Sequence, residues 1–234
     1  MMQWIVLVVM GAPVALAMQV VSRLRARGHE GQAMRLYRRT SWALGLSIYI
    51  AMAVHEGVLI VSGLLNWQTG LPLHLCSMMG LLTLPMLLSG RPILWHLALY
   101  LGLPGATMAL LFPSVVLTPW PLATELSFFV LHAGLMVAPL MPLYLGRRPS
   151  ARGAAEAGVC ILAVGLIMIA INDLLDSNYL FVNWAVPGTP LESISHWGIV
   201  AYRVLLAGLC VLVLAAEGTG VRLFGRLMEK HRES

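Results

Sequence analysis

The chain has 234 residues, of which 59% are hydrophobic and only 11% are charged, with a mean hydropathy of +0.83. Soluble domains carry about 25% charged residues, so this composition excludes a water-soluble protein. A helix needs about 20 apolar residues to cross the hydrocarbon core of a bilayer. The sequence therefore predicts an all-α fold, a polytopic bundle of about seven transmembrane helices that forms one integral membrane domain over residues 1–234.

Seven apolar segments follow one another along the chain, separated by short stretches that are basic or contain proline or glycine. The first of them is kept as a span, because no basic residue precedes its apolar run as one would in a signal peptide. The predicted spans cover residues 3–22, 41–66, 70–90, 93–112, 123–145, 154–175 and 198–217.

The basic residues indicate how the spans are oriented. With the N-terminus outside, every one of the 15 Lys and Arg residues except Arg203 falls at a cytoplasmic end: in the loop predicted over 23–40, in the two later loops on that side, or in the tail. This matches the positive-inside rule. We therefore expect a multi-pass protein of the bacterial cytoplasmic (inner) membrane with a cytoplasmic C-terminus. The net charge of +5 then indicates contact with membrane lipids, and no nucleic-acid partner is expected.

The three cysteines do not form a recognisable framework. Cys76, Cys160 and Cys210 lie in separate apolar segments without CxxC spacing, so neither a disulfide pattern nor a zinc site is indicated. No cofactor is predicted. A metal site built from His55, His74 and His132 remains an open but disfavoured alternative.

Polar residues gather in one half of the predicted membrane. Ionisable side chains within spans are costly and usually face the interior of the bundle. On the predicted topology, four spans carry such residues in their outer halves, Asn178 and Tyr179 follow at the rim, and Arg203 lies near the outer end of the last span. These residues are His55, Glu56, His74, Cys76, Glu125, His132, Asn172, Asp173, Asn178, Tyr179 and Arg203. We expect them to form a polar chamber around Cys76.

Spacing suggests which of these side chains meet. His74 and Cys76 are two residues apart, so they point away from each other if both are helical. A histidine partner for Cys76 must then come from another helix, and His132 is favoured. Glu125 precedes His132 by seven residues and shares its face. Asn172, Asp176 and Tyr179 would also share one face if the sixth helix continues that far.

Four segments together resemble the YwaF-type bacterial integral membrane proteins, over about residues 40–215. They are LPLHLC at 71–76, the segment from Gly105 to Pro113, FFVLHAG at 128–134 and NDLLDSNYLFVNWAVPGTPL at 172–191. Animal relatives of that family include a membrane acyltransferase that remodels ether phospholipids through a cysteine. The resemblance implies that Cys76 is the acyl-accepting nucleophile, that His132 is its base, and that Asn178 and Tyr179 belong to the pocket.

The favoured hypothesis is a cysteine-dependent lipid acyltransferase in the outer half of the bilayer. A thiolate is the reacting species, and Cys76 in the first turns of a helix would benefit from the positive end of the helix dipole. His132 would take the thiol proton, and Glu125 would orient the histidine or balance its charge. The expected substrate-binding residues are His55, Glu56, His74, Asn172, Asp173, Asn178, Tyr179 and Arg203.

Two other functions fit the same pattern of residues. A small-solute or ion-coupled transporter or binding protein would use the polar pocket for its substrate. An assembly or sensor protein would use these polar groups only to hold its helices together.

Overall fold

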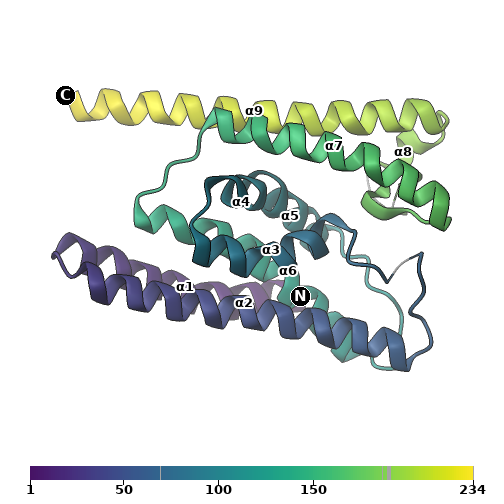
Figure 1. Cartoon of the computed structure of the whole chain (residues 1–234), viewed down its shortest axis with the longest axis horizontal. Coiled ribbons are helices and arrows are strands. Elements are labelled where there is room, and N and C mark those ends of the chain that lie inside the picture. The colour runs from purple at the N-terminus through teal and green to yellow at the C-terminus, as the bar shows by residue number, and fades with distance from the viewer. Residues whose placement is uncertain (69, 186, 189–190, 234) are drawn as a thin grey trace. The chain divides into compact units, whose positions relative to one another are not determined.

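The computed structural model describes residues 1–68, 70–185, 187–188 and 191–233, without the side chains of residue 195 and of residues 221–233. The described chain is helical and contains no strand within these ranges (Figure 1). Six helices of the described residues are long and apolar enough to cross a membrane, which confirms the predicted polytopic helical bundle. The chain divides into two compact units, Met1–Arg147 and Arg148–Ser234, and each is described by itself.

The first unit begins with a helical hairpin. Helix α1 (Met2–Ala26) and helix α2 (Glu30–Val61) lie side by side in opposite directions (Figure 1). The predicted loop over 23–40 is wrong, because only residues 27–29 separate the two helices. Arginine is a good helix former, so the arginines end the apolar stretch without ending the helix.

Helix α3 (Leu75–Ser89) is shorter than the span predicted over 70–90. Its 15 residues are mostly apolar but too few to cross a bilayer alone. The preceding helix also ends early, at Val61 rather than at residue 66. Helix α3 stops at Gly90, whose φ of 66° lies in the left-handed region that glycine adopts without strain.

The fourth predicted span is one rod made of three pieces: α4 (Pro92–Leu97), the π-helical turn η1 (Ala98–Gly102) and α5 (Leu103–Leu111). Pro104 has no amide hydrogen for the regular ladder, and the wider π turn ends at Gly102, shortly before it. The fifth span consists of α6 (Pro121–Val137) and the 3₁₀ segment η2 (Ala138–Leu145), which contains Pro139 and Pro142. Both rods match the predicted spans closely.

The centre of the first unit is packed where glycines let helices approach. A Cβ added to Gly134 of α6 would lie 2.6 Å from Ile48 Cγ1 of α2. A Cβ added to Gly80 of α3 would lie 2.7 Å from Met52 Sδ and 3.0 Å from Leu131 Cδ1. Real Cβ atoms do not come this close to their neighbours, so α2, α3 and α6 reach their separation only because these positions lack side chains.

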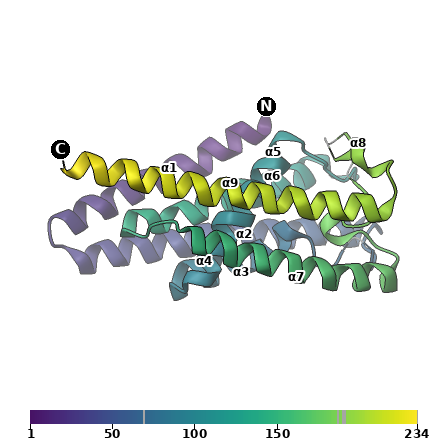
Figure 2. The same ribbon diagram turned by 90° about the horizontal axis from the view of Figure 1, so that it is seen from above.

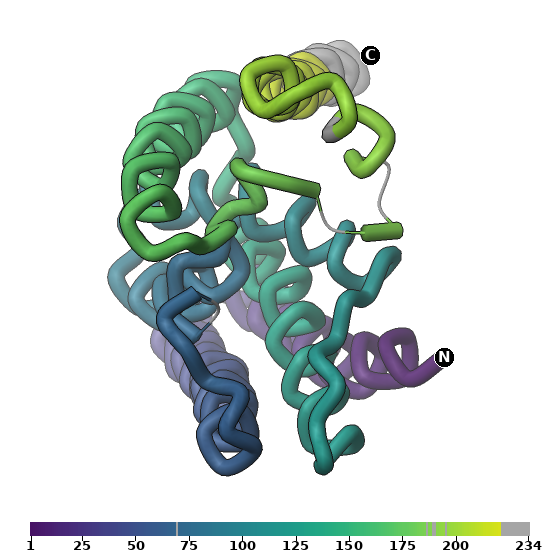
Figure 3. Tube along the Cα trace, turned by 90° about the vertical axis from the view of Figure 1, so that its right-hand side faces the viewer, coloured from purple at the N-terminus to yellow at the C-terminus, as the bar shows by residue number. Residues whose placement is uncertain are grey.

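The second unit is built on two long helices. Helix α7 (Ala151–Leu175) and helix α9 (Ile199–Glu233) run side by side in opposite directions, as Figures 1 and 2 show. Figure 3 shows the two helices end-on. Ser150 caps α7, since its Oγ accepts a hydrogen bond from the amide of Gly153 at 3.0 Å.

The segment between α7 and α9 holds the 3₁₀ turn η3 (Tyr179–Phe181) and the short helix α8 (Glu192–Ser195). Residues 186, 189 and 190 of the predicted 176–197 loop lie outside the described residues. Helix α9 starts where the last span was expected and continues beyond residue 217. The side chains of the basic tail also fall outside the described part.

Candidate functional site

The predicted site residues divide between the two units. His55, Glu56, His74, Cys76, Glu125 and His132 belong to the first unit, and Asn172, Asp173, Asn178, Tyr179 and Arg203 belong to the second. Within each unit, the structure shows which of them share contacts.

Cys76 is the second residue of α3, in the first turn as expected, and its side chain is partly exposed. It packs against a buried cluster formed by Met79, Ala106 and Leu135. Leu131 and Met136 of α6 pack against the same cluster. Cys76 therefore contacts the same part of the core as the turn of α6 that carries His132.

The imidazole of His132 is buried, with 5% exposure, and its orientation is defined. Its Nδ1 lies 2.7 Å from the carbonyl oxygen of Phe128, one turn earlier in α6. A carbonyl oxygen only accepts, so Nδ1 carries the hydrogen and Nε2 keeps its lone pair. The Phe128 ring lies against the imidazole with centroids 4.1 Å apart. Such an imidazole is prepared to accept a proton at Nε2.

The relative heights of the site residues follow from the contacts of α2 and α3. Gly45 faces Leu84, whereas Met52 faces Gly80, so the numbering of α3 falls as that of α2 rises. Cys76 lies about one turn before Gly80 in this direction.

His55 and Glu56 lie about one turn after Met52 in α2, and both are partly exposed. These two residues are therefore nearly level with Cys76. His132 follows Leu131, which meets Gly80, on the side away from Cys76, so it lies about five residues, roughly 7.5 Å, from that level. By this register His55 is nearly level with Cys76, and His132 lies more than one helical turn away in height.

The remaining residues of this set have distinct surroundings. His55 Nδ1 is buried and has no hydrogen-bond partner among the described residues. His74 is the extended residue that precedes α3, with φ −71° and ψ 148°, so it does not share the helix with Cys76. Glu125 is partly exposed, and it does not hold His132 through Nδ1, because that nitrogen is hydrogen-bonded to the Phe128 carbonyl. Its role in orienting the imidazole through Nε2 or in balancing its charge stays a prediction.

In the second unit, the side chain of Asn172 holds the chain that follows α7. Its Oδ1 accepts hydrogen bonds from Ser177 Oγ at 2.7 Å and from the Tyr179 amide at 2.8 Å. Its Nδ2 donates to the Tyr179 carbonyl oxygen at 2.9 Å. Asn172 is 1% exposed. Its amide is thus committed to the loop, which argues against the predicted substrate contact.

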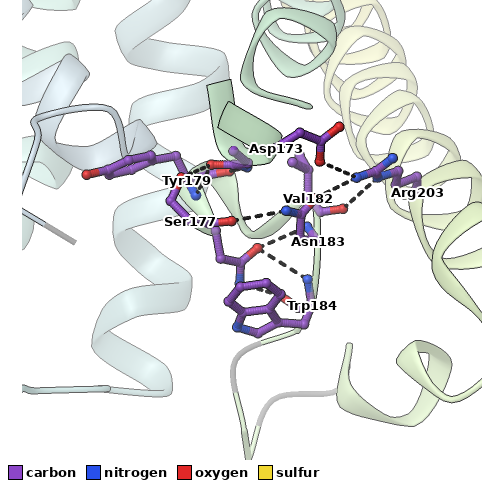
Figure 4. Close-up of polar contacts among 9 residues, drawn as sticks. Asp173, Ser177, Tyr179, Val182, Asn183, Trp184 and Arg203 are labelled. Atoms are coloured by element: carbon purple, nitrogen blue, oxygen red, sulfur yellow. Dashed lines mark hydrogen bonds and ion pairs between the residues drawn. The ribbon is translucent and has the colours of Figure 1, made fainter. Parts of the chain in front are cut away.

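The side chain of Asn178 holds the next part of this loop through the backbone of Asn183 and Trp184, two residues labelled in Figure 4. Its Oδ1 accepts from the amides of Asn183 at 2.9 Å and Trp184 at 3.2 Å, and its Nδ2 donates to the Trp184 carbonyl at 2.8 Å. Tyr179 is fully buried. Helix α7 ends at Leu175 and Asp176 has φ 50°, so the predicted common helical face of Asn172, Asp176 and Tyr179 does not exist.

Arg203 of α9 is bound to the same loop rather than free (Figure 4). Its Nε donates to the Val182 carbonyl at 3.2 Å and its Nη2 donates to Asn183 Oδ1 at 2.6 Å. Asp173 lies 3.8 Å from Nη2, with its side chain 66% exposed against 28% for Arg203. Tyr202 adds a bond from its hydroxyl to the Phe181 carbonyl at 2.7 Å.

Sequence reasoning missed these loop contacts, since it read the polar residues as pocket residues. The run DSNYLFVN contains Asn and Asp residues, which commonly hydrogen-bond to nearby backbone. That signal points to a structured loop. Among the described residues, no group of three or more His, Cys, Asp or Glu side chains is placed to hold a metal ion.

Comparison with known proteins identifies a family. The model of the TMEM164 family matches residues 1–215. No curated protein and no solved structure shows significant similarity to the chain. The resemblance to YwaF-type proteins and the relationship to an acyltransferase stay predictions.

Proposed function

We propose that this chain, which belongs to the TMEM164 family, is a membrane-embedded acyltransferase that uses Cys76 as its nucleophile. The observation that carries the proposal is the shared contact of Cys76 and the His132 turn with one buried cluster in the first unit. The family match adds that this is a membrane protein, in which lipid acyl esters are the available acyl donors.

The proposed reaction has two steps. A base takes the proton of the Cys76 thiol, and Sγ attacks the carbonyl carbon of a lipid acyl ester. The ester C–O bond breaks, the lipid alcohol leaves with a proton, and the acyl group stays on Cys76 as a thioester. The hydroxyl of a second lipid then attacks the thioester, gives up its proton and restores the thiol.

Two features of the fold support the first step. Cys76 lies in the first turn of α3, where the backbone dipole favours a negative charge. His132 has its Nδ1 bonded to a backbone carbonyl, so Nε2 is the nitrogen that accepts the proton. His55 lies closer to the level of Cys76 and serves as the comparison residue in any test of the base.

The surroundings of the reaction follow from charge. We assign the arginine-rich helix ends to the cytoplasmic side, so the proposed reaction takes place in the outer half of a bacterial inner membrane. The substrates are accordingly phospholipids of the outer leaflet.

The test is acyl transfer by the full-length protein reconstituted in phospholipid bilayers. A donor phospholipid with an isotope-labelled acyl chain and a lysophospholipid acceptor are supplied, and the product is measured by mass spectrometry. Wild type is expected to transfer the chain, Cys76→Ser to lose transfer, and Cys160→Ser and Cys210→Ser to retain it. Transfer that is equal in Cys76→Ser and wild type would refute the proposal.

A further inference from the structure

We propose that the groove between α1 and α2 binds one anionic phospholipid of the leaflet on the arginine-rich side of the membrane. The groove has a volume of about 350 Å³. One wall is formed by Pro13, Val14 and Ala17 of α1, and these residues are all apolar.

The other wall changes from charged to apolar along α2. Arg39 and Thr40 lie at one end, and Ala43 and Leu44 lie at the other. The Thr40 hydroxyl is already used, since it donates to the Leu36 carbonyl at 3.0 Å. Arg39 therefore supplies the polar chemistry of the groove, and the rest of the lining is suited to a hydrocarbon chain.

The guanidinium of Arg39 is available to a ligand. Arg39 is exposed, and it makes no hydrogen bond or ion pair with any residue in the described ranges. A guanidinium presents five N–H donors in a planar fork that fits a phosphate group. Arg35 and Arg38 lie within the same turn or so of α2 and are also exposed, which raises the positive potential at this end.

The position of the groove along the helix fits a lipid. Arg39 directly precedes the apolar stretch of α2, which begins after Ser41. Such a residue lies at the boundary between headgroups and hydrocarbon. From Arg39 to Leu44 is five residues, or about 7.5 Å along the helix. A phosphate at Arg39 would thus place the first part of an acyl chain against Ala43 and Leu44.

The groove is open towards the bilayer. Leu16 of α1 and Trp42 and Leu46 of α2 are large apolar side chains exposed next to it. The small side chains of Ala17 and Ala43 leave room between these neighbours. A lipid can therefore move from the bilayer into the groove without passing through water.

The occupant is a phospholipid rather than free phosphate, because inorganic phosphate gains nothing from the apolar lining. A zwitterionic phospholipid also carries a phosphate, but the cationic amine of its headgroup would be repelled by Arg35 and Arg38, so an anionic headgroup is favoured. The groove does not include Cys76, so this inference stands apart from the proposed acyl transfer.

Native mass spectrometry of the full-length protein in detergent tests the proposal. Wild type is titrated with phosphatidylglycerol, and the fraction carrying one retained lipid gives the affinity. Arg39→Gln is expected to weaken binding by roughly tenfold or more, and Arg38→Gln by less than about twofold. Ala43→Leu is expected to abolish retention by filling the groove, while Ala53→Leu, at an exposed position of the same helix, leaves it unchanged.

Four results would overturn the proposal. Equal losses of lipid binding in Arg39→Gln and Arg38→Gln would mean that the basic surface attracts the lipid without a specific site. Undiminished retention in Ala43→Leu would place the lipid elsewhere. Displacement of the lipid by millimolar inorganic phosphate would identify a phosphate site. Equal retention of phosphatidylcholine would show that the negative charge of the lipid is not recognised. Thermal unfolding of each variant without added lipid confirms that it is folded.

Discussion

The Nδ1 atom of His132 is held 2.7 Å from the carbonyl oxygen of Phe128, within one turn of α6. A backbone carbonyl cannot be removed by a side-chain substitution, so the orientation of the imidazole is built into the helix. The other nitrogen, Nε2, is left as the acceptor.

This arrangement predicts different effects for substitutions at the two residues. His132→Gln removes the base and is expected to lower the acyl-transfer rate by roughly 10²–10⁴-fold. Phe128→Leu keeps the carbonyl and should cost less than about tenfold. The rates are measured with the labelled donor lipid in reconstituted bilayers. A Phe128→Leu variant as inactive as His132→Gln would mean that the ring, not the carbonyl, positions the histidine.

His55 provides the companion experiment. Its Nδ1 has no partner in the described residues and it is nearly level with Cys76. If His132 is the base, His55→Gln is expected to raise KM more than it lowers kcat. If His55→Gln instead lowers kcat as strongly as His132→Gln does, the proton goes to His55 and the assignment of the base must change.

Close packing at Gly134 predicts a loss of stability with a specific rescue. A Cβ there would lie 2.6 and 2.7 Å from Ile48 Cγ1 and Cδ1. Gly134→Ala is expected to destabilise the protein by about 1–3 kcal/mol, seen as a lower thermal unfolding temperature in detergent. Ile48→Ala removes both clashing atoms, so the double variant should recover part of the loss.

The matched control is Gly165→Ala in α7. Among the described residues, no atom lies within 4 Å of a Cβ added there, apart from the local helix. Alanine favours a helix over glycine, so this variant is expected to be neutral or slightly more stable. Equal destabilisation at both positions would contradict the packing account.

The hydrogen bonds of Asn172 predict that it acts in folding rather than in substrate binding. Asn172→Ala would leave the Tyr179 backbone and the Ser177 hydroxyl without their partners, at a cost of about 1–3 kcal/mol. Thermal unfolding is the measurement, with Asp173→Asn as the control, since that exposed carboxylate lies 3.8 Å from Arg203. A surface ion pair contributes about 0–1 kcal/mol.

If Asn172→Ala unfolds like wild type but loses acyl transfer, the pocket role predicted from the sequence would be restored. A larger loss in Asp173→Asn than in Asn172→Ala would show that the ion pair, not the amide, holds the loop.

The distribution of arginines predicts the orientation in the membrane. In a variant lacking its native cysteines, a cysteine introduced at Trp67 is expected to react with an impermeant maleimide added outside intact cells. A cysteine introduced at Arg148 should react only after the membrane is opened. The reverse pattern would invert the topology and place Cys76 in the cytoplasmic half.

Hydropathy predicted the positions of the long helices because burial in lipid demands long apolar runs. It did not predict the ends of the first three helices. Residues 23–40 leave the apolar stretch but remain helical apart from residues 27–29, because arginine suits a helix in water as well as at the interface. Residues 70–74, by contrast, were predicted to begin the span over 70–90 because they are mostly apolar, yet they are not helical.

The sequence predicted the position of part of the candidate site but not the roles of its asparagines. Cys76 lies in the first turn of α3, as expected, and packs against the same buried cluster as Leu131 and Met136 of α6, while its pairing with His132 stays a prediction. The roles of Asn172 and Asn178 were not predictable from polarity, because an amide that lines a pocket and an amide that ties a loop look alike in sequence. Only the geometry of their hydrogen bonds separates the two.

The most direct test of the central claim is to trap the acyl group on the protein. Wild type in bilayers is incubated with the labelled donor phospholipid without acceptor, quenched in acid and digested, and the peptides are analysed by mass spectrometry. The account predicts an acyl thioester on Cys76 that neutral hydroxylamine removes and that disappears when a lysophospholipid is added. An acyl group found on Cys160 or Cys210 instead, or transfer that proceeds in Cys76→Ser, would contradict it.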